Sequence, residues 1–212
     1  MQSTDETTWK IAHQNEQWNW NHSVDEDVLG NLRQDSVILY TDMLELPRNT
    51  DLTGKYILDI GGGYTSLLTA FQGKFAGVVV DPADKKDEVI DYYKKFNVIY
   101  IQATAEEYLT GLYWKYDEVW MYNVLKHTFD PELIMRSLPK AGKVLRIAEL
   151  TDTIQDVAHP HILTKEWLTD MLKEISTEGN YHEEHRDVLI HPDNTPFHLD
   201  SFGGVFKLKE TP

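Results

Sequence analysis

A glycine-rich turn followed by an aspartate is the part of this sequence best suited to hold a ligand. The turn begins at Asp59 and contains three consecutive glycines, Gly61, Gly62 and Gly63. Glycine lets the backbone approach a bound molecule more closely than a Cβ would allow. Asp81 ends the next apolar run, where a carboxylate can accept hydrogen bonds from both ribose hydroxyls of an adenosine. This combination predicts a site for a ligand that contains a nucleoside.

The elements that would position this turn alternate regularly along the middle of the chain. Apolar runs typical of buried strands cover residues 56–60, 77–81, 98–101, 118–122 and 143–147. Helical patterns between them cover residues 65–71, 85–96, 105–109 and 131–138. Such alternation predicts a parallel sheet with helices on both faces. Ligands bind such a sheet beyond the carboxyl ends of its strands, where the glycine turn and Asp81 would lie.

The two ends of the chain depart from this alternation. Residues 1–53 are polar, carry several aromatic residues and are mostly helical in pattern, so we expect an N-terminal helical extension. A helix is predicted over 164–175, with Thr164 as its N-cap. Strand patterns at 181–189 and 204–208 lack a full crossover helix between them, which predicts an antiparallel pair closing one edge of the sheet. We therefore expect an extension over 1–53 and a ligand-binding domain over 54–212.

The composition of the chain argues against several kinds of function. The 212 residues contain 35 Asp and Glu against 20 Lys and Arg, a formal charge of −15 that disfavours nucleic acid as a partner. The absence of cysteine excludes a disulfide framework, a thiolate nucleophile and a cysteine zinc site. No apolar run is long enough to span a membrane, so we expect a cytoplasmic protein without a membrane partner. The spacing of the histidines predicts no metal site.

The glycine turn taken alone is compatible with two kinds of cofactor. Gly61, Gly63 and Ser66 come close to the dinucleotide fingerprint, in which a third glycine or an alanine would stand in place of Ser66. Three features count against a nicotinamide dinucleotide. A long helical segment precedes the first strand, the acidic Asp59 stands just before the glycines, and no second substrate domain is expected.

Four segments of the chain resemble the class I S-adenosylmethionine-dependent methyltransferases. YILDIGGGYTS is similar to the first motif of that family, and VVVDP is similar to the second. IQATAEEY resembles the segment at the adenine, and the stretch from YDEVWMYNVLKH to GKVLRIAE resembles the fourth and fifth strands. The resemblance covers roughly residues 54–150 and extends more loosely to 209. It implies an α/β, Rossmann-like, doubly wound fold with a mostly parallel seven-stranded sheet, and S-adenosylmethionine as the cofactor.

The resemblance implies that the glycine turn and the aspartate after the second strand bind the cofactor. Gly61 and Gly63 would line the methionine end and the sugar, with Asp59 and Gly62 in the same turn. Asp81 would bind the ribose hydroxyls.

The resemblance also implies contacts from the ends of the third and fourth strands. Thr104 and Ala105 would face the adenine, and Asn123 would lie beside the amino group or the methyl donor. Thr104 replaces the Asp that the family commonly has there, and a hydroxyl accepts a hydrogen bond more weakly than a carboxylate. We therefore expect a divergent adenine contact.

Candidates for the transfer step lie near the expected strand ends. Methyl transfer is an in-line displacement at a sulfonium carbon, so an enzyme mainly positions the acceptor and can remove its proton. The side chains in these loops that could take up a proton are His127, Glu149, Asp152, His159 and His161. His127 and Glu149 have the best claim to a catalytic role, because they follow the fourth strand and end the fifth.

Contacts to the methyl acceptor are expected from outside the cofactor motifs. The candidates are Trp18 and His22 in the N-terminal segment, and His159 and His161 in the loop after the fifth strand. The N-terminal aromatic residues could form a cover that excludes water, or a helix that packs on the sheet. Our main hypothesis is a methyltransferase that acts on a small polar acceptor at oxygen or nitrogen.

Three other functions stay open at this point. The glycine turn could serve a nicotinamide-dependent oxidoreductase. The chain could bind S-adenosylmethionine without catalysis, or transfer a different group of the same cofactor.

Overall fold

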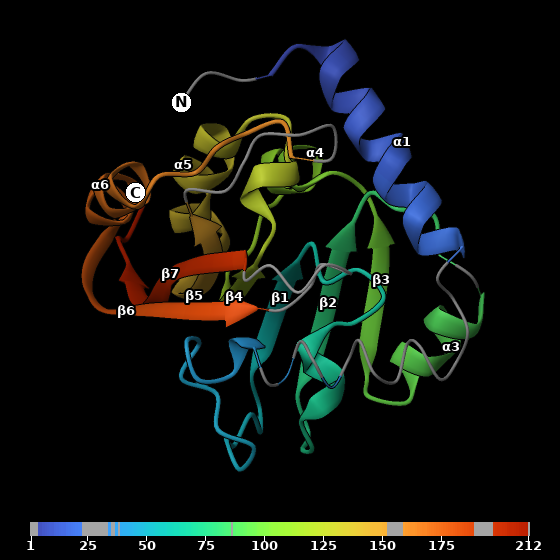
Figure 1. Cartoon of the computed structure of the whole chain (residues 1–212). Coiled ribbons are helices and arrows are strands. Elements are labelled where there is room, and N and C mark those ends of the chain that lie inside the picture. Colours follow the sequence, from blue (N-terminus) through green and yellow to red (C-terminus); the bar gives the residue numbers. More distant parts are fainter. Residues whose placement is uncertain are drawn as a thin grey trace.

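A seven-stranded sheet forms the centre of the molecule (Figure 1). The computed structural model describes residues 4–22, 34, 37, 39–85, 87–151, 159–188 and 197–211. Its strands are β1 Tyr56–Ile60, β2 Ala76–Asp81, β3 Val98–Gln102, β4 Tyr116–Tyr122, β5 Gly142–Thr151, β6 Ser176–Val188 and β7 Phe197–Leu208.

The strand order is β3-β2-β1-β4-β5-β7-β6. Strands β1 to β5 are parallel, whereas β7 runs antiparallel to both β5 and β6. The sheet reverses its order of winding between β1 and β4, and this is the place where open α/β sheets bind ligands. The predicted doubly wound fold with an antiparallel C-terminal pair is confirmed.

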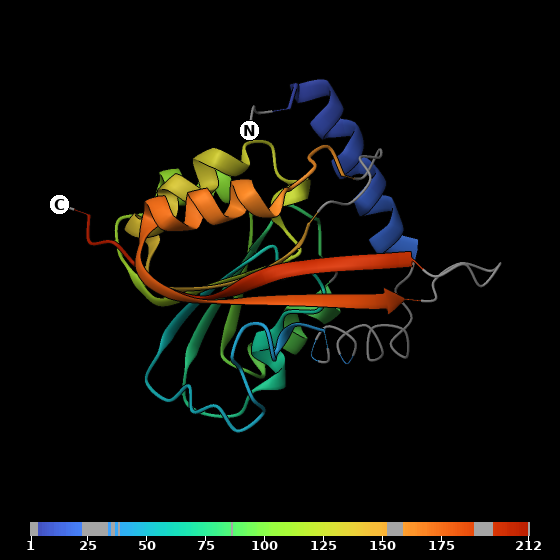
Figure 2. The ribbon, with the colours of Figure 1, turned by 60° about the vertical axis from the view of Figure 1, so that its left-hand side comes forward.

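Helices cover both faces of the sheet, and one helix lies across the carboxyl ends of the strands (Figures 1 and 2). α4, α5 and α6 pack on one face, and α3 packs on the other together with residues 43–52 and the short helix η1. α1 crosses above the carboxyl ends of β1 to β3 (Figure 1). The bounds are α1 Glu6–His22, η1 Leu67–Ala70, α3 Asp87–Lys94, α4 Ala105–Thr110, η2 Leu125–His127, α5 Pro131–Ala141 and α6 Lys165–Ile175.

The glycine turn leads into a short 3-10 helix instead of the longer helix predicted over 65–71. η1 contains only four residues, and the Ser66 hydroxyl oxygen accepts a hydrogen bond from its Leu68 N–H. The preceding N–H groups are bound by two tyrosine hydroxyls, Tyr93 at the Ser66 N–H and Tyr122 at the Leu67 N–H. These tertiary hydrogen bonds satisfy the backbone donors at the start of η1, which an N-cap would otherwise have to serve.

The other helix starts follow the sequence closely. Thr164 accepts a hydrogen bond from the Trp167 N–H and is the N-cap of α6, as predicted. Pro131 occupies the first turn of α5, where its missing N–H costs nothing.

The two C-terminal strands are longer than their apolar patterns predict. β6 has 13 residues and β7 has 12, and they pair along almost their whole length. The residues from Glu178 to His185 on the edge strand β6 are mostly polar and exposed. Burial therefore imposes no apolar alternation that the sequence could reveal.

In the described part of the chain, no helix is long and apolar enough to cross a membrane.

Candidate functional site

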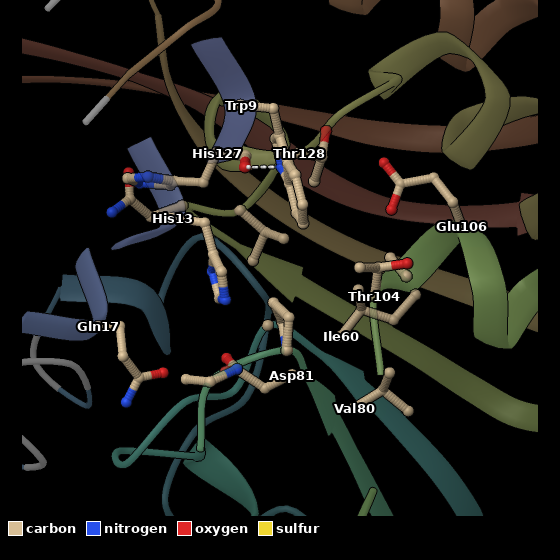
Figure 3. A pocket seen from close by; sticks show the side chains of 16 residues that line it. Trp9, His13, Gln17, Ile60, Val80, Asp81, Thr104, Glu106, His127 and Thr128 are labelled. Carbon is tan, nitrogen blue, oxygen red and sulfur yellow. Dashed lines mark hydrogen bonds between the residues drawn. The ribbon is translucent and has the colours of Figure 1, made fainter. Parts of the chain in front are cut away.

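A cavity lies between α1 and the carboxyl ends of β1, β2, β3 and β4 (Figure 3). Its volume is about 620 Å³ when the open mouth is included. Five of the residues expected to bind a cofactor line it: Gly61, Asp81, Thr104, Ala105 and Asn123. They come from four separate segments of the chain, so the fold brings them together as the sequence motifs imply.

The glycine turn has no room for side chains where it approaches neighbouring segments. Gly61 has φ of 70°, and a Cβ on it would lie 2.5 Å from a methyl group of Val124. A Cβ on Gly62 would lie 2.6 Å from a carboxylate oxygen of Asp59. Gly61 lines the cavity, whereas Gly62 and Gly63 lie outside the set of lining residues. The turn therefore presents backbone to the cavity at Gly61 and packs against protein at Gly62.

Asp81 joins the glycine turn to the end of β2. One carboxylate oxygen accepts a hydrogen bond from the Gly63 N–H at 3.0 Å. The other accepts from the Ala83 N–H at 2.9 Å and from Lys85 Nζ at 3.2 Å. Because two carboxylate oxygens together offer about four acceptor positions, Asp81 retains capacity for a ligand hydroxyl.

Asp59 lies behind the turn and does not line the cavity. Its side chain is fully buried, and one oxygen accepts hydrogen bonds from Ser66 Oγ at 2.6 Å and from Tyr122 Oη at 2.7 Å. Its other oxygen has no hydrogen-bond partner among the described residues. Burial raises the pKa of Asp59 to about 7. Its contacts therefore shape the glycine turn from within the core.

Asn123 lines the cavity and has a buried acceptor. It follows β4 with φ of 57°, a left-handed conformation that asparagine tolerates better than most residues. Its N–H donates to the carbonyl of Ala148 at 2.7 Å. Its Oδ1 is buried and has no partner in the part of the chain that the structure describes. Buried acceptors are normally satisfied, so this atom fits a hydrogen-bond donor supplied by a ligand.

Glu149 holds the turn that contains Asn123. Its carboxylate is fully buried and accepts hydrogen bonds from the Val124 N–H at 2.9 Å and the Leu125 N–H at 3.1 Å. Burial raises the pKa of Glu149 to about 7, although these hydrogen bonds favour its ionised form. Glu149 was expected to be catalytic, but it is not among the residues that line the cavity. Its hydrogen bonds instead fix the start of η2.

The segment after β3 contributes a lining residue that the sequence did not reveal. Thr104 lines the cavity and is also the N-cap of α4, where its hydroxyl oxygen accepts from the Glu107 N–H at 3.2 Å. Glu106 lines the cavity as well, and its Oε1 accepts from the Phe129 N–H at 2.9 Å and the Asp130 N–H at 3.0 Å. The acidic residue directly after Thr104-Ala105 was the available signal.

One face of α1 closes the cavity. Trp9, His13 and Gln17 line it from above (Figure 3), and their spacing of four residues places them on the same side of a helix. Trp9 Nε1 donates to the carbonyl of His127 at 3.2 Å, and the Trp9 and His13 rings are stacked with centroids 5.3 Å apart. Burial lowers the pKa of His13, so its imidazole is neutral at neutral pH. Gln17 exchanges two hydrogen bonds with the backbone of Asp84, at 3.2 and 2.8 Å.

Two residues of α1, Trp18 and His22, were expected to contact the methyl acceptor. Trp18 is 58% exposed and is not among the lining residues. The side chain of His22 lies outside the described residues. The available signal for the lining face was the spacing of Trp9, His13 and Gln17, which recur every fourth residue.

Of the three candidate histidines, His127 is among the residues that line the cavity, whereas His159 and His161 are not. His127 lines the cavity, and its ring packs against that of His159 with centroids 4.8 Å apart. His161 is buried instead, with its Nε2 2.9 Å from the carbonyl oxygen of Thr128, and burial lowers its pKa. Asp152, the remaining candidate base, lies outside the described residues.

Comparison with known proteins shows similarity in structure. No family model and no curated protein matches the sequence. Magnesium protoporphyrin IX methyltransferase from Synechocystis PCC 6803, solved with bound S-adenosylmethionine, has a TM-score of 0.60 at 12% identity and covers 98% of this chain and 100% of its own. The N-terminal domain of EvdMO1, solved with S-adenosylhomocysteine and D-fucose, has a TM-score of 0.55 at 12% identity, with 84% and 83% covered.

A third solved structure is also similar to this chain, and the similar region is part of a longer protein. It is Haemonchus contortus phosphoethanolamine N-methyltransferase 2, in complex with phosphomonomethylethanolamine and S-adenosylhomocysteine. Its TM-score is 0.58 at 14% identity, and the match covers 84% of this chain and 53% of that one. The protein therefore has the fold of the class I S-adenosylmethionine-dependent methyltransferases.

Proposed function

We propose that this chain binds S-adenosylmethionine in the cavity under α1 and transfers its methyl group to a small polar acceptor. The observation that carries the proposal is the meeting of Gly61, Asp81 and Asn123 around one cavity. Gly61 offers backbone at close range, Asp81 offers carboxylate oxygens for ribose hydroxyls, and the buried Asn123 Oδ1 offers an acceptor for the ammonium of the methionine part. Thr104 and Ala105 would lie against the adenine.

The backbone after the glycine turn supports this cofactor over a dinucleotide. Dinucleotide-binding folds direct free N–H groups at a helix N-terminus toward the pyrophosphate. Here the N–H groups of Ser66, Leu67 and Leu68 already donate to Tyr93, Tyr122 and the Ser66 hydroxyl. These donors are unavailable to a phosphate, and the helix that follows is a single 3-10 turn.

For the transfer step we propose His127 as the residue that receives the acceptor's proton. S-adenosylmethionine supplies an activated methyl group, so the chain's own task is to position the acceptor and accept a proton. His127 lines the cavity beside His159, and Glu149 holds the neighbouring turn through the Val124 and Leu125 N–H groups. Glu149 would therefore contribute to the reaction by positioning Asn123.

Two of the neighbouring structures support a small acceptor. They were solved with phosphomonomethylethanolamine or D-fucose, together with S-adenosylhomocysteine. The position of α1 over the cavity agrees with an acceptor of limited size. We retain the division into an N-terminal extension over 1–53 and a cofactor-binding domain over 54–212 as part of the proposal. Within the extension, α1 forms the cover, whereas residues 43–52 pack on the sheet.

Calorimetric titration with S-adenosylhomocysteine tests the proposal directly. We expect saturable binding that Asp81→Ala weakens at least tenfold, about 1.4 kcal/mol. Asp81→Asn keeps the size of the side chain and removes its charge. A similar loss in this variant shows that the carboxylate, and not the space that Ala leaves, is responsible. Asp91→Ala, an exposed aspartate on α3 that pairs with Lys94, is the matched control and should bind as the wild type does. A folded wild-type protein that gives no heat would sink the proposal.

Thermal unfolding tests the oxidoreductase alternative, and an activity assay tests the non-catalytic one. A rise in melting temperature with NAD and none with S-adenosylhomocysteine would favour a nicotinamide-dependent oxidoreductase. Production of S-adenosylhomocysteine with any acceptor would exclude a binding protein without catalysis.

A further inference from the structure

Glu106 presents a carboxylate oxygen that the described parts of the protein leave unused. Its Oε1 is held by two backbone donors, the Phe129 N–H at 2.9 Å and the Asp130 N–H at 3.0 Å. No residue in the described ranges donates a hydrogen bond to its Oε2, and no described Lys, Arg or His forms an ion pair with it. The side chain lines the cavity next to Thr104 (Figure 3). The site therefore contains a fixed negative acceptor.

Thr104, at the position where the adenine acceptor was expected, is committed to the helix. Its Oγ accepts from the Glu107 N–H and its own N–H donates to the Glu107 carboxylate, both at 3.2 Å. This reciprocal pair is a capping box, and it orients the hydroxyl along the start of α4. A neutral hydroxyl used in this way is a weak acceptor for a ligand amine.

We propose that Glu106 recognises the exocyclic amino group of the cofactor's adenine, taking the part that the residue at Thr104 cannot fill. The inference rests on the proposed function, because it concerns the same cofactor. An aromatic amino group is a donor, and a carboxylate oxygen with no other partner is the strongest acceptor available to it. The two backbone bonds at Oε1 hold the carboxylate in place, so Oε2 needs little reorganisation to receive the ligand.

The same two backbone donors determine what a Glu106→Gln variant would do. The Phe129 and Asp130 N–H groups require an acceptor, so the glutamine would place its Oε1 there. Its amide nitrogen, which can only donate, would then occupy the position of Oε2. The variant would present a donor to the purine where the wild type presents an acceptor. A purine with a 6-oxo group should therefore suit the variant better than one with a 6-amino group.

Isothermal titration with S-adenosylhomocysteine and S-inosylhomocysteine measures this preference, since the two ligands differ at that purine position. We expect the wild type to prefer the adenosyl ligand at least tenfold. In Glu106→Gln we expect the adenosyl ligand to lose at least tenfold in affinity and the inosyl ligand to gain, so that the preference disappears or reverses. Because the preference is a ratio within one protein, a general loss of folded protein does not produce it.

Two variants serve as controls. Glu107→Gln changes the neighbouring exposed acidic residue and keeps an acceptor for the Thr104 N–H, so the ratio should stay at the wild-type value. Thr104→Val removes the hydroxyl, and under the proposal it weakens both ligands equally.

The outcomes separate this inference from the proposed function. Tight adenosyl binding with an unchanged ratio in Glu106→Gln overturns the role of Glu106 and leaves the cofactor site intact. If Thr104→Val loses the preference for the adenosyl over the inosyl ligand, the adenine contact belongs to Thr104, and the inference is also overturned. If the wild type binds neither ligand, both proposals are wrong.

Discussion

Replacing Gly61 by alanine tests whether the close approach of the glycine turn to η2 is required. The wild-type φ of 70° lies in the left-handed region, which costs a residue with a Cβ about 1–2 kcal/mol. The new Cβ would also lie 2.5 and 2.7 Å from the two methyl carbons of Val124, and overpacking of this kind costs roughly 1–3 kcal/mol. We therefore expect Gly61→Ala to lower the free energy of unfolding by about 2–5 kcal/mol.

A double-mutant cycle separates the two contributions. Val124→Ala removes the methyl groups that the new Cβ would meet, so the double variant should keep the backbone cost and lose the steric one. We expect the pair to be more stable than the sum of the single effects by about 1–3 kcal/mol. Urea unfolding followed by circular dichroism measures all four proteins.

Gly111→Ala is the matched control. Gly111 has φ of −86°, and a Cβ there would approach no atom closer than 3.7 Å. Its stability should match the wild type or exceed it by less than about 1 kcal/mol. Equal unfolding midpoints for Gly61→Ala and Gly111→Ala would refute the steric reasoning, and additive effects in the cycle would refute the contact with Val124.

Three further predictions concern other contacts of the fold and the site. Burial holds the pKa of Asp59 at about 7 against an ordinary 3.8, so the stability its proton contributes is complete below pH 3.8 and lost as the pH rises through 7. Between pH 5 and 8 the wild type should lose about 3 kcal/mol relative to Asp59→Asn in urea unfolding. Arg146→Met should destabilise the fold by about 2–4 kcal/mol, because it removes a 2.6 Å ion pair from the buried Glu118. Gln17→Ala should speed dissociation of S-adenosylhomocysteine about tenfold in stopped-flow measurements, because two hydrogen bonds hold the cover.

Each of these predictions has a control. A stability difference between wild type and Asp59→Asn that is constant with pH would show that Asp59 does not titrate in this range. Lys143→Met breaks an exposed pair with Asp117 and should cost less than about 1 kcal/mol, so an equal loss in Arg146→Met would contradict the burial argument. Gln14→Ala alters an exposed residue of the same helix and should leave the dissociation rate unchanged.

The sequence was informative about the fold because burial imposes a period on it. The continuous apolar strands β1, β2 and β4 could be placed to within about two residues, as could the N-cap Thr164. The polar edge strand β6 could not, since exposed residues on an edge carry no such period.

The site was only partly predictable, because a sequence motif indicates where a residue lies but not which atoms it bonds. Asp59 and Glu149 both lie near the carboxyl ends of buried strands, and both turn into the core to hold backbone or hydroxyl groups. Glu106 was missed because its two partners, the Phe129 and Asp130 N–H groups, lie more than twenty residues away in the chain. Contacts of this range depend on tertiary packing.

The attachment of α1 affects the residence time of a ligand, whereas the residues after the strands determine which ligand is recognised. The helix is tied by hydrogen bonds from Trp9 to the His127 carbonyl and from Gln17 to the Asp84 backbone, while the residues proposed to bind the nucleoside follow the strands of the sheet. Each tie contributes only about 0.5–1.5 kcal/mol, so the helix can lift without unfolding the sheet. Substitutions on α1 could therefore lengthen or shorten residence time over evolution while the groups that face the nucleoside stay the same.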